Sequence, residues 1–124
     1  MSFTFKRLYP YSDVDAARSV SEIWVTKQVV QFGRTLTLEV YWRFRLLLTK
    51  TADEGAIRNE QIFRHIGEGF YEFKVKTERL YCFYDGRRLV LTHGDKKRSD
   101  RAVEERKRAG KIKTEYFAWI GSKK

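Results

Sequence analysis

Residues 70–97, FYEFKVKTERLYCFYDGRRLVLTHGDKK, form the stretch that decides the fold. Three short runs rich in aromatic and β-branched residues are separated by turn-like breaks, a pattern that predicts an antiparallel meander. The second break is Asp85-Gly86, and an Asp-Gly pair between two apolar runs favours a two-residue hairpin loop in which both residues have positive φ. We expect Asp85-Gly86 to form this loop and Thr77-Glu78 to form the loop of the preceding hairpin.

These two loops predict the cross-strand pairs and therefore the faces of the sheet. The predicted pairs are Tyr84 with Arg87, Cys82 with Leu89, Leu80 with Leu91, Lys76 with Arg79, Lys74 with Tyr81 and Glu72 with Phe83. One face carries the residues expected in the core: Tyr71, Phe73, Val75, Leu80, Cys82, Tyr84, Leu89 and Leu91. In this register His93 also lies on the core face, unless the strand ends or bulges before it.

The other face gathers one carboxylate, four cations and a phenol: Glu72, Lys74, Lys76, Arg79, Tyr81 and Arg88. An ordinary solvated face is the alternative interpretation, because antiparallel sheets often leave one side in water. Mixed signs are more usual on such a face, so the excess of cations favours an anionic partner.

Composition indicates one folded, strongly basic domain over residues 1–124. The chain has 42% hydrophobic and 15% aromatic residues, a net charge of +10 and a pI of about 9.9, which favours nucleic acid or an acidic protein segment as partner. The single cysteine, Cys82, excludes an intrachain disulfide, and no zinc-ligand spacing is present, so we expect no metal or cofactor. Without a signal-peptide pattern or a run of ~20 apolar residues, we expect a cytoplasmic protein that does not enter a membrane.

The remainder of the chain predicts an α+β fold. The N-terminal part is expected to have a first strand at residues 3–8, a helix from Ser12 to Val20, and either a strand at residues 22–32 or a continuation of that helix as far as Gly33. An amphipathic helix from Thr35 to Asp53 that stops at Gly55, a connector at residues 57–66, and, after the meander, a basic last helix capped by Ser99 or Asp100 are also expected. The last helix has Ala102, Ala109, Ile112, Tyr116 and Ile120 on one stripe.

The order of these features resembles the RelE/HigB toxin superfamily, and most of all its phage-derived HigB-like branch. The resemblance covers about residues 35–117 and is carried by Gly69-Phe70-Tyr71-Glu72-Phe73-Lys74, Arg79-Leu80-Tyr81-Cys82-Phe83-Tyr84, Leu91-Thr92-His93-Gly94 and Lys96-Lys97. It implies N-terminal helices packed on a small, twisted, mostly antiparallel sheet. It also implies a toxin of a type II toxin–antitoxin system that cuts ribosome-bound mRNA without a metal and is neutralised by a cognate antitoxin protein.

RNA cleavage by the 2′-hydroxyl requires a base, a cation for the charged phosphate and an acid for the leaving 5′-oxygen. Glu72 is the candidate base, with Lys74 as its partner or as an alternative base. Arg79 is the candidate phosphate clamp, Tyr81 a base-stacking group or proton donor, and His93 a candidate acid, with a structural histidine as the alternative. The candidates for holding the RNA backbone by charge are Lys76, Arg88, Lys96, Lys97, Arg98 and Arg101.

Two other functions fit the same sequence. A non-catalytic relative of the ParE kind inhibits a protein target such as gyrase and needs no catalytic base. A basic phage nucleic-acid-binding protein would bind RNA or DNA with a steep dependence on salt and would leave growth unaffected.

Overall fold

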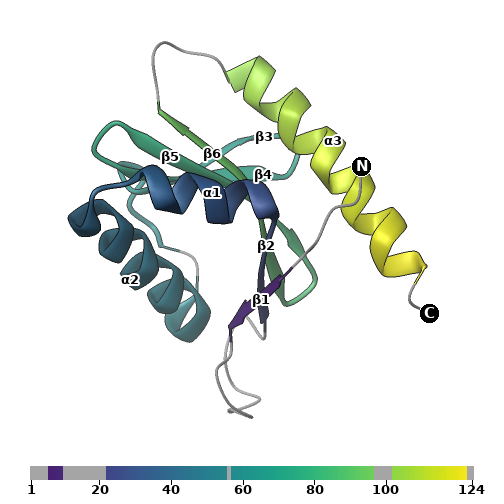
Figure 1. Ribbon diagram of the computed structural model, residues 1–124, viewed down its shortest axis with the longest axis horizontal. Coiled ribbons are helices and arrows are strands. Elements are labelled where there is room, and N and C mark those ends of the chain that lie inside the picture. The colour runs from purple at the N-terminus through teal and green to yellow at the C-terminus, as the bar shows by residue number, and fades with distance from the viewer. Residues whose placement is uncertain (1–5, 10–21, 56, 97–101, 123–124) are drawn as a thin grey trace.

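A computed structural model of the chain describes residues 6–9, 22–55, 57–96 and 102–122 (Figure 1). The described residues form an α+β fold with three helices and a mixed, mostly antiparallel sheet whose strand order is β1-β2-β6-β5-β4-β3. The strands are β1 (Lys6–Tyr9), β2 (Glu22–Val25), β3 (Phe63–Gly67), β4 (Phe70–Val75), β5 (Glu78–Asp85) and β6 (Arg88–Lys96). The helices are α1 (Lys27–Thr35), α2 (Leu38–Glu54) and α3 (Ala102–Gly121). Among the described strands, only β2 and β6 pair in parallel.

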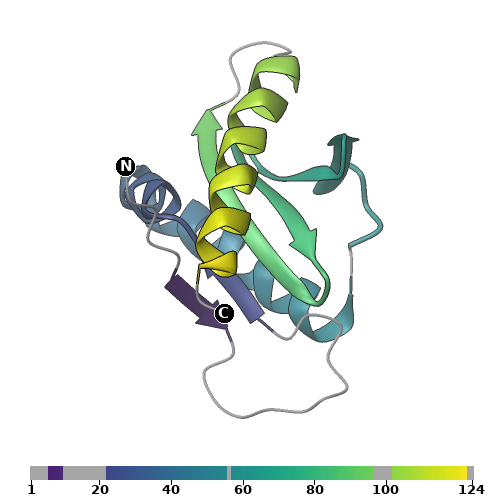
Figure 2. The same ribbon diagram turned by 90° about the vertical axis from the view of Figure 1, so that its right-hand side faces the viewer.

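Helices cover both faces of the sheet, with α1 and α2 on one side and α3 on the other, as Figure 2 shows from the α3 side. The larger core lies between the sheet and the first two helices. It contains the buried members of the predicted core face, which are Phe73, Val75, Leu80, Cys82, Leu89 and Leu91, with Tyr71 and Tyr84 packed against them. The prediction of this face is therefore confirmed.

The opposite face of the meander is covered by α3 and is not the open cationic surface that the sequence suggests. A second apolar cluster lies there: Ile66, Phe70, Tyr81, Phe83, Val90, Ala109, Ile112 and Tyr116. Phe70, Phe83 and Val90 stand on this face between the charged positions, and the apolar stripe of α3 packs on them.

Both hairpin loops lie one residue away from their predicted positions. Lys76-Thr77 and Gly86-Arg87 are the loops, so Lys74 pairs with Arg79, Glu72 with Tyr81 and Tyr84 with Leu89. In each loop the first residue has positive φ, 55° at Lys76 and 58° at Gly86. This conformation favours glycine, which occupies the position in the second loop but not in the first. In each of these pairs the observed partner lies two residues from the predicted one. Because side chains alternate between the faces with a period of two, each of these residues still lies on its predicted face.

A β-bulge reverses the predicted orientation of His93. Cys82 pairs with Leu91 but Tyr81 pairs with His93, so Thr92 is an extra residue in β6. Beyond this point the odd-numbered residues of β6 face α3 instead of α1. His93 therefore lies on the face of Glu72 and Tyr81, and its predicted place on the core face is wrong.

The N-terminal half follows the sequence in part. The helix expected at Thr35–Asp53 is α2, which ends at Gly55 with φ 97°. Residues 22–32 begin with the expected strand, β2, and continue into a separate helix, α1, whose N-cap Thr26 accepts a hydrogen bond from the Val29 amide. The connector expected at residues 57–66 includes most of an edge strand, β3. The helix expected from Ser12 to Val20 lies outside the described residues, and no helix within them is long and apolar enough to cross a membrane.

Candidate functional site

Polar side chains cross four strands of the sheet in a single row. The strand register places Arg64 of β3 opposite Glu72 of β4, Glu72 opposite Tyr81 of β5, and Tyr81 opposite His93 of β6. Glu105 of α3 completes the row by meeting His93 from above the sheet. We call these five residues the polar row.

Glu72 is a buried carboxylate held by one arginine. Its side chain is 4% exposed, and its Oε1 lies 2.8 Å from Nη2 of Arg64, whose own side chain is 40% exposed. The cation offsets the cost of burying the carboxylate. Because one end of this pair reaches solvent, the pair connects the buried row to the surface.

Tyr81 and His93 form the centre of the row. Their rings stack, with centroids 4.6 Å apart and planes 18° from parallel. Burial raises the pKa of the Tyr81 phenol well above its ordinary value, and the negative charges of Glu105 and Glu72 raise it further. The phenol therefore keeps its proton at physiological pH and can act only as a proton donor or a hydrogen-bonding group.

Both ring nitrogens of His93 have partners within the protein. Nε2 lies 2.6 Å from Oε2 of Glu105, and Nδ1 lies 3.1 Å from Oγ1 of Thr92, whose hydroxyl donates to the Tyr81 carbonyl. The ring is fully buried, and this burial lowers its pKa although the hydrogen bond to Glu105 acts in the opposite direction. In this arrangement His93 holds Tyr81 and α3 in place and has no free nitrogen for a substrate.

A second set of charged residues lies beside the row, about 7 Å along the strands. Lys74 pairs with Arg79, and Arg79 pairs with Asp95, whose carboxylate lies 3.8 Å from Arg108 of α3. Nη1 of Arg79 donates to the carbonyls of Lys76 and Glu78 at 2.8 and 3.0 Å. Arg79 is partly exposed and its charge lowers the pKa of Tyr81, so its guanidinium acts on the phenol while remaining accessible.

The five candidate catalytic residues thus lie in these two neighbouring sets, but several candidate RNA-binding residues lie elsewhere. Lys76 is in a hairpin loop, and its ammonium lies 3.3 Å from Glu39 of α2. Arg88 lies at the far end of β6, where it pairs with Glu22 at 3.2 Å and donates to Tyr116. Lys96 is exposed at the opposite end of the same strand. Lys97, Arg98 and Arg101 lie outside the described residues.

Sequence reasoning missed two members of the polar row. Arg64 lies within the expected connector, where Phe63–Gly67 is in fact a strand, and Glu105 lies on the expected last helix, in which the sequence predicts no catalytic residue. The apolar stripe of α3 was visible in the sequence, and a carboxylate beside that stripe indicates a buried partner. Together with the apolar residues Phe70 and Phe83, this signal could have shown that α3 covers the site.

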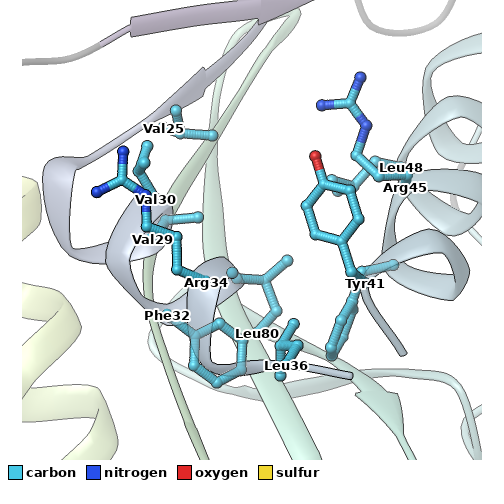
Figure 3. A pocket seen from close by; sticks show the side chains of 12 residues that line it. Val25, Val29, Val30, Phe32, Arg34, Leu36, Tyr41, Arg45, Leu48 and Leu80 are labelled. Carbon is cyan, nitrogen blue, oxygen red and sulfur yellow. The ribbon is translucent and has the colours of Figure 1, made fainter. Parts of the chain in front are cut away.

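A separate apolar hollow of about 360 Å³ lies between α1 and α2 (Figure 3). Leu80 and Val25 belong to its wall on the sheet side, and the charged ends of Arg34 and Arg45 lie on opposite sides of it. Apart from Tyr41, Arg34 and Arg45 its lining is apolar or glycine, and it includes no carboxylate or histidine that could act as a base, so we do not place catalysis there.

Neither a protein-family model nor a curated protein sequence matches the chain. The site and the fold therefore carry the functional argument alone.

Proposed function

We propose that this protein is a toxin of the RelE/HigB kind that cleaves ribosome-bound mRNA by attack of the ribose 2′-hydroxyl on the adjacent phosphate. The observation that carries the proposal is the register of the sheet. It brings Glu72, Tyr81 and His93 onto one row, beside the row of Lys74 and Arg79. A base, a proton donor and two cations then lie close enough to one another to act on a single phosphodiester.

The proposed steps assign one task to each side chain. Glu72, oriented by Arg64, takes the proton of the 2′-hydroxyl. Arg79 stabilises the charge that develops on the phosphate oxygens, with Lys74 beside it. Tyr81 gives its proton to the leaving 5′-oxygen, and its raised pKa suits that role because the proton is present at neutral pH. The products are a 2′,3′-cyclic phosphate and a free 5′-hydroxyl.

Access to the row sets a condition on this chemistry. Glu72, Tyr81 and His93 are 3%, 6% and 0% exposed, so a phosphate reaches them only when the start of α3 moves away from the sheet. Such a movement breaks the hydrogen bond between His93 and Glu105. In this proposal His93 is a positioning residue, and a cognate antitoxin binds the protein in the cytoplasm.

The burial of the row favours a second candidate function. A toxin that inhibits a protein target needs no accessible base, and the covered row is then a structural network under α3. This candidate predicts that toxicity survives the loss of Glu72 and Arg79.

Inducible expression in bacteria, with primer extension on abundant mRNAs, distinguishes the mRNA-cleaving toxin from the protein-inhibiting toxin. Wild type is compared with Glu72→Gln and Arg79→Ala, and the matched controls are Glu104→Gln and Arg87→Ala, which change the same residue types at exposed positions that are not part of the row. We expect growth arrest and new mRNA ends for wild type and both controls only. Arrest that persists in soluble Glu72→Gln and Arg79→Ala proteins would replace the proposal with the protein-inhibiting toxin.

A further inference from the structure

α2 has an apolar stripe on the side that faces away from the sheet. Leu38, Trp42 and Leu46 are 71%, 54% and 68% exposed. Their spacing of four residues aligns them along one side of the helix. We call these three residues the α2 stripe.

The α2 stripe is not the side by which the helix packs in the fold. Val40, Phe44 and Leu48 fill that role and are buried against the sheet. Single exposed apolar side chains are common on protein surfaces, but three aligned ones form a continuous patch, which is typical of a binding surface. The Trp42 ring lies edge-on to Tyr41 with centroids 5.5 Å apart, so the largest side chain of the stripe is braced by a neighbour.

A groove of about 340 Å³ runs beside the α2 stripe, between α2 and β4. Leu46 belongs to both features, and Leu47, Ile62 and Val75 give the groove an apolar floor. Cations line the groove as well, namely Arg43, Lys74 and Lys76. Glu39 pairs with two of them, 3.9 Å from Arg43 and 3.3 Å from Lys76, so a single carboxylate is shared between two cations.

We propose that the α2 stripe and its groove bind an amphipathic helix of a partner protein whose apolar side chains are flanked by carboxylates. Apolar side chains at helical spacing would pack along Leu38, Trp42 and Leu46, with one of them entering the groove. Flanking carboxylates would meet Arg43, Lys76 and the exposed Lys50 of the next turn. Trp42 stands at the centre of the surface and is the expected hot spot.

Charge argues against a second copy of this chain as the occupant. Each copy has a net charge of +10, and a symmetric pair would set the cations of this surface against one another. The surface lies on the face of the sheet opposite the polar row. Lys74 lines the groove and also belongs to the proposed catalytic residues, but the contacts proposed for the partner helix are made by other residues and use no member of the polar row.

The test is a selection from a display library of helical peptides about as long as α2, with wild-type protein as the bait. The affinities of the enriched peptides are then measured for wild type, Trp42→Ala and the matched control Val103→Ala, which truncates a 57% exposed apolar residue of α3. We expect acidic peptides with apolar residues at helical spacing, at least about 10-fold weaker binding to Trp42→Ala, and unchanged binding to Val103→Ala. Charge-reversed versions of the same peptides should not bind.

Three results would overturn the inference. The first is a set of enriched peptides that bind Trp42→Ala as well as they bind wild type. The second is a wild-type protein that dimerises in sedimentation experiments and becomes monomeric on Trp42→Ala, because a second copy is then the occupant. The third is RNA whose binding weakens on Trp42→Ala, because the stripe is then a stacking surface for bases.

Discussion

Thr92 is one extra residue in β6, and it decides which side chain occupies the polar row. Its carbonyl accepts a hydrogen bond of 2.8 Å from Thr26, and its hydroxyl donates to the Tyr81 carbonyl at 3.2 Å. These bonds tie the bulge to the N-cap of α1 and to β5. Because the bulge reverses the alternation of side chains, His93 faces α3 and Gly94 faces α1.

Gly94 should be intolerant of any side chain. A Cβ at this position would overlap the ring of Phe32 in α1. We expect Gly94→Ala to lower the free energy of unfolding by about 1–3 kcal/mol, the usual cost of overpacking. Urea denaturation measures this loss, with Gly110→Ala as the control, because a Cβ there meets nothing within 4 Å and a helical alanine should stabilise the protein by about 0.5–1 kcal/mol. Equal stabilities of the two variants would contradict the packing of α1 on β6.

His93 should make stability depend on pH. Burial lowers the pKa of its ring in the folded protein, so below about pH 6.5 the unfolded chain binds a proton that the folded protein does not. The free energy of unfolding should therefore fall as pH decreases below this value, by at most ~1.4 kcal/mol per pH unit from this residue. Denaturation of wild type and His93→Gln across this range isolates the effect, because the variant lacks the titrating ring. Parallel pH profiles for the two proteins would show that His93 does not titrate differently on folding.

At the scale of the elements, α3 is attached to the sheet by polar contacts at both ends. Near its start, Glu105 bonds to His93, and Arg106 donates to the Ile66 carbonyl at 2.7 Å. Near its end, the Tyr116 hydroxyl donates to Asp85 at 2.8 Å. Between these contacts Ala109 and Ile112 are buried against the sheet, so α3 is both part of the core and the cover of the polar row.

Loss of the Glu105 carboxylate should loosen the start of α3. Glu105→Ala leaves the buried Nε2 of His93 without its partner, and we expect a loss of about 1–3 kcal/mol in the free energy of unfolding. Hydrogen exchange should also become faster at the β6 amides near His93. Glu104→Ala, at the exposed neighbouring position, should change stability by no more than about 0.5 kcal/mol. Similar losses for the two variants would mean that the contact with His93 does not hold the helix.

Helices and strands were predictable where apolar residues recur with a regular period. Loop positions and the β-bulge were less predictable, because the conformation of a single residue determines them. The apolar repeat that ends at Gly55 indicated α2, and the turn signals indicated the meander. The positions of the loops were wrong by one residue, because positive φ was expected at both Asp85 and Gly86, whereas among these it occurs at Gly86. The bulge at Thr92 has no periodic signature, and consequently the sequence placed Glu72 and Tyr81 on the same face but not His93.

At the scale of the whole molecule, the ion pairs within the fold leave a large positive charge uncompensated. The net charge is +10, and the ion pairs of the polar row and of α2 neutralise only individual sites. Composition predicted an anionic partner, but it could not show that α3 covers one candidate surface while the α2 stripe remains uncovered. Which surface is covered depends on the face of the meander against which the apolar residues of α3 pack.

The proposed binding of RNA should weaken steeply with salt. If about four to six phosphates are contacted, raising the salt concentration from roughly 50 to 200 mM should reduce the affinity for single-stranded RNA about 10²-fold. Fluorescence anisotropy with a labelled RNA measures the slope, which Arg79→Gln should reduce by about 0.7 if the guanidinium contacts a phosphate. A slope that is flat, or unchanged by Arg79→Gln, would argue against this residue as a phosphate clamp.

The chemistry of the cleaved ends tests the central claim most directly. Ribosomes programmed with a defined mRNA are incubated with purified wild-type protein or Glu72→Gln, and the cut is mapped and its ends are identified. We predict a 2′,3′-cyclic phosphate and a 5′-hydroxyl with wild type, no cleavage with Glu72→Gln, and no cleavage when the nucleotide before the cut carries a 2′-deoxyribose. An intact mRNA with folded wild-type protein, or a cut that persists with the 2′-deoxy nucleotide, would contradict cleavage at the polar row by 2′-hydroxyl attack.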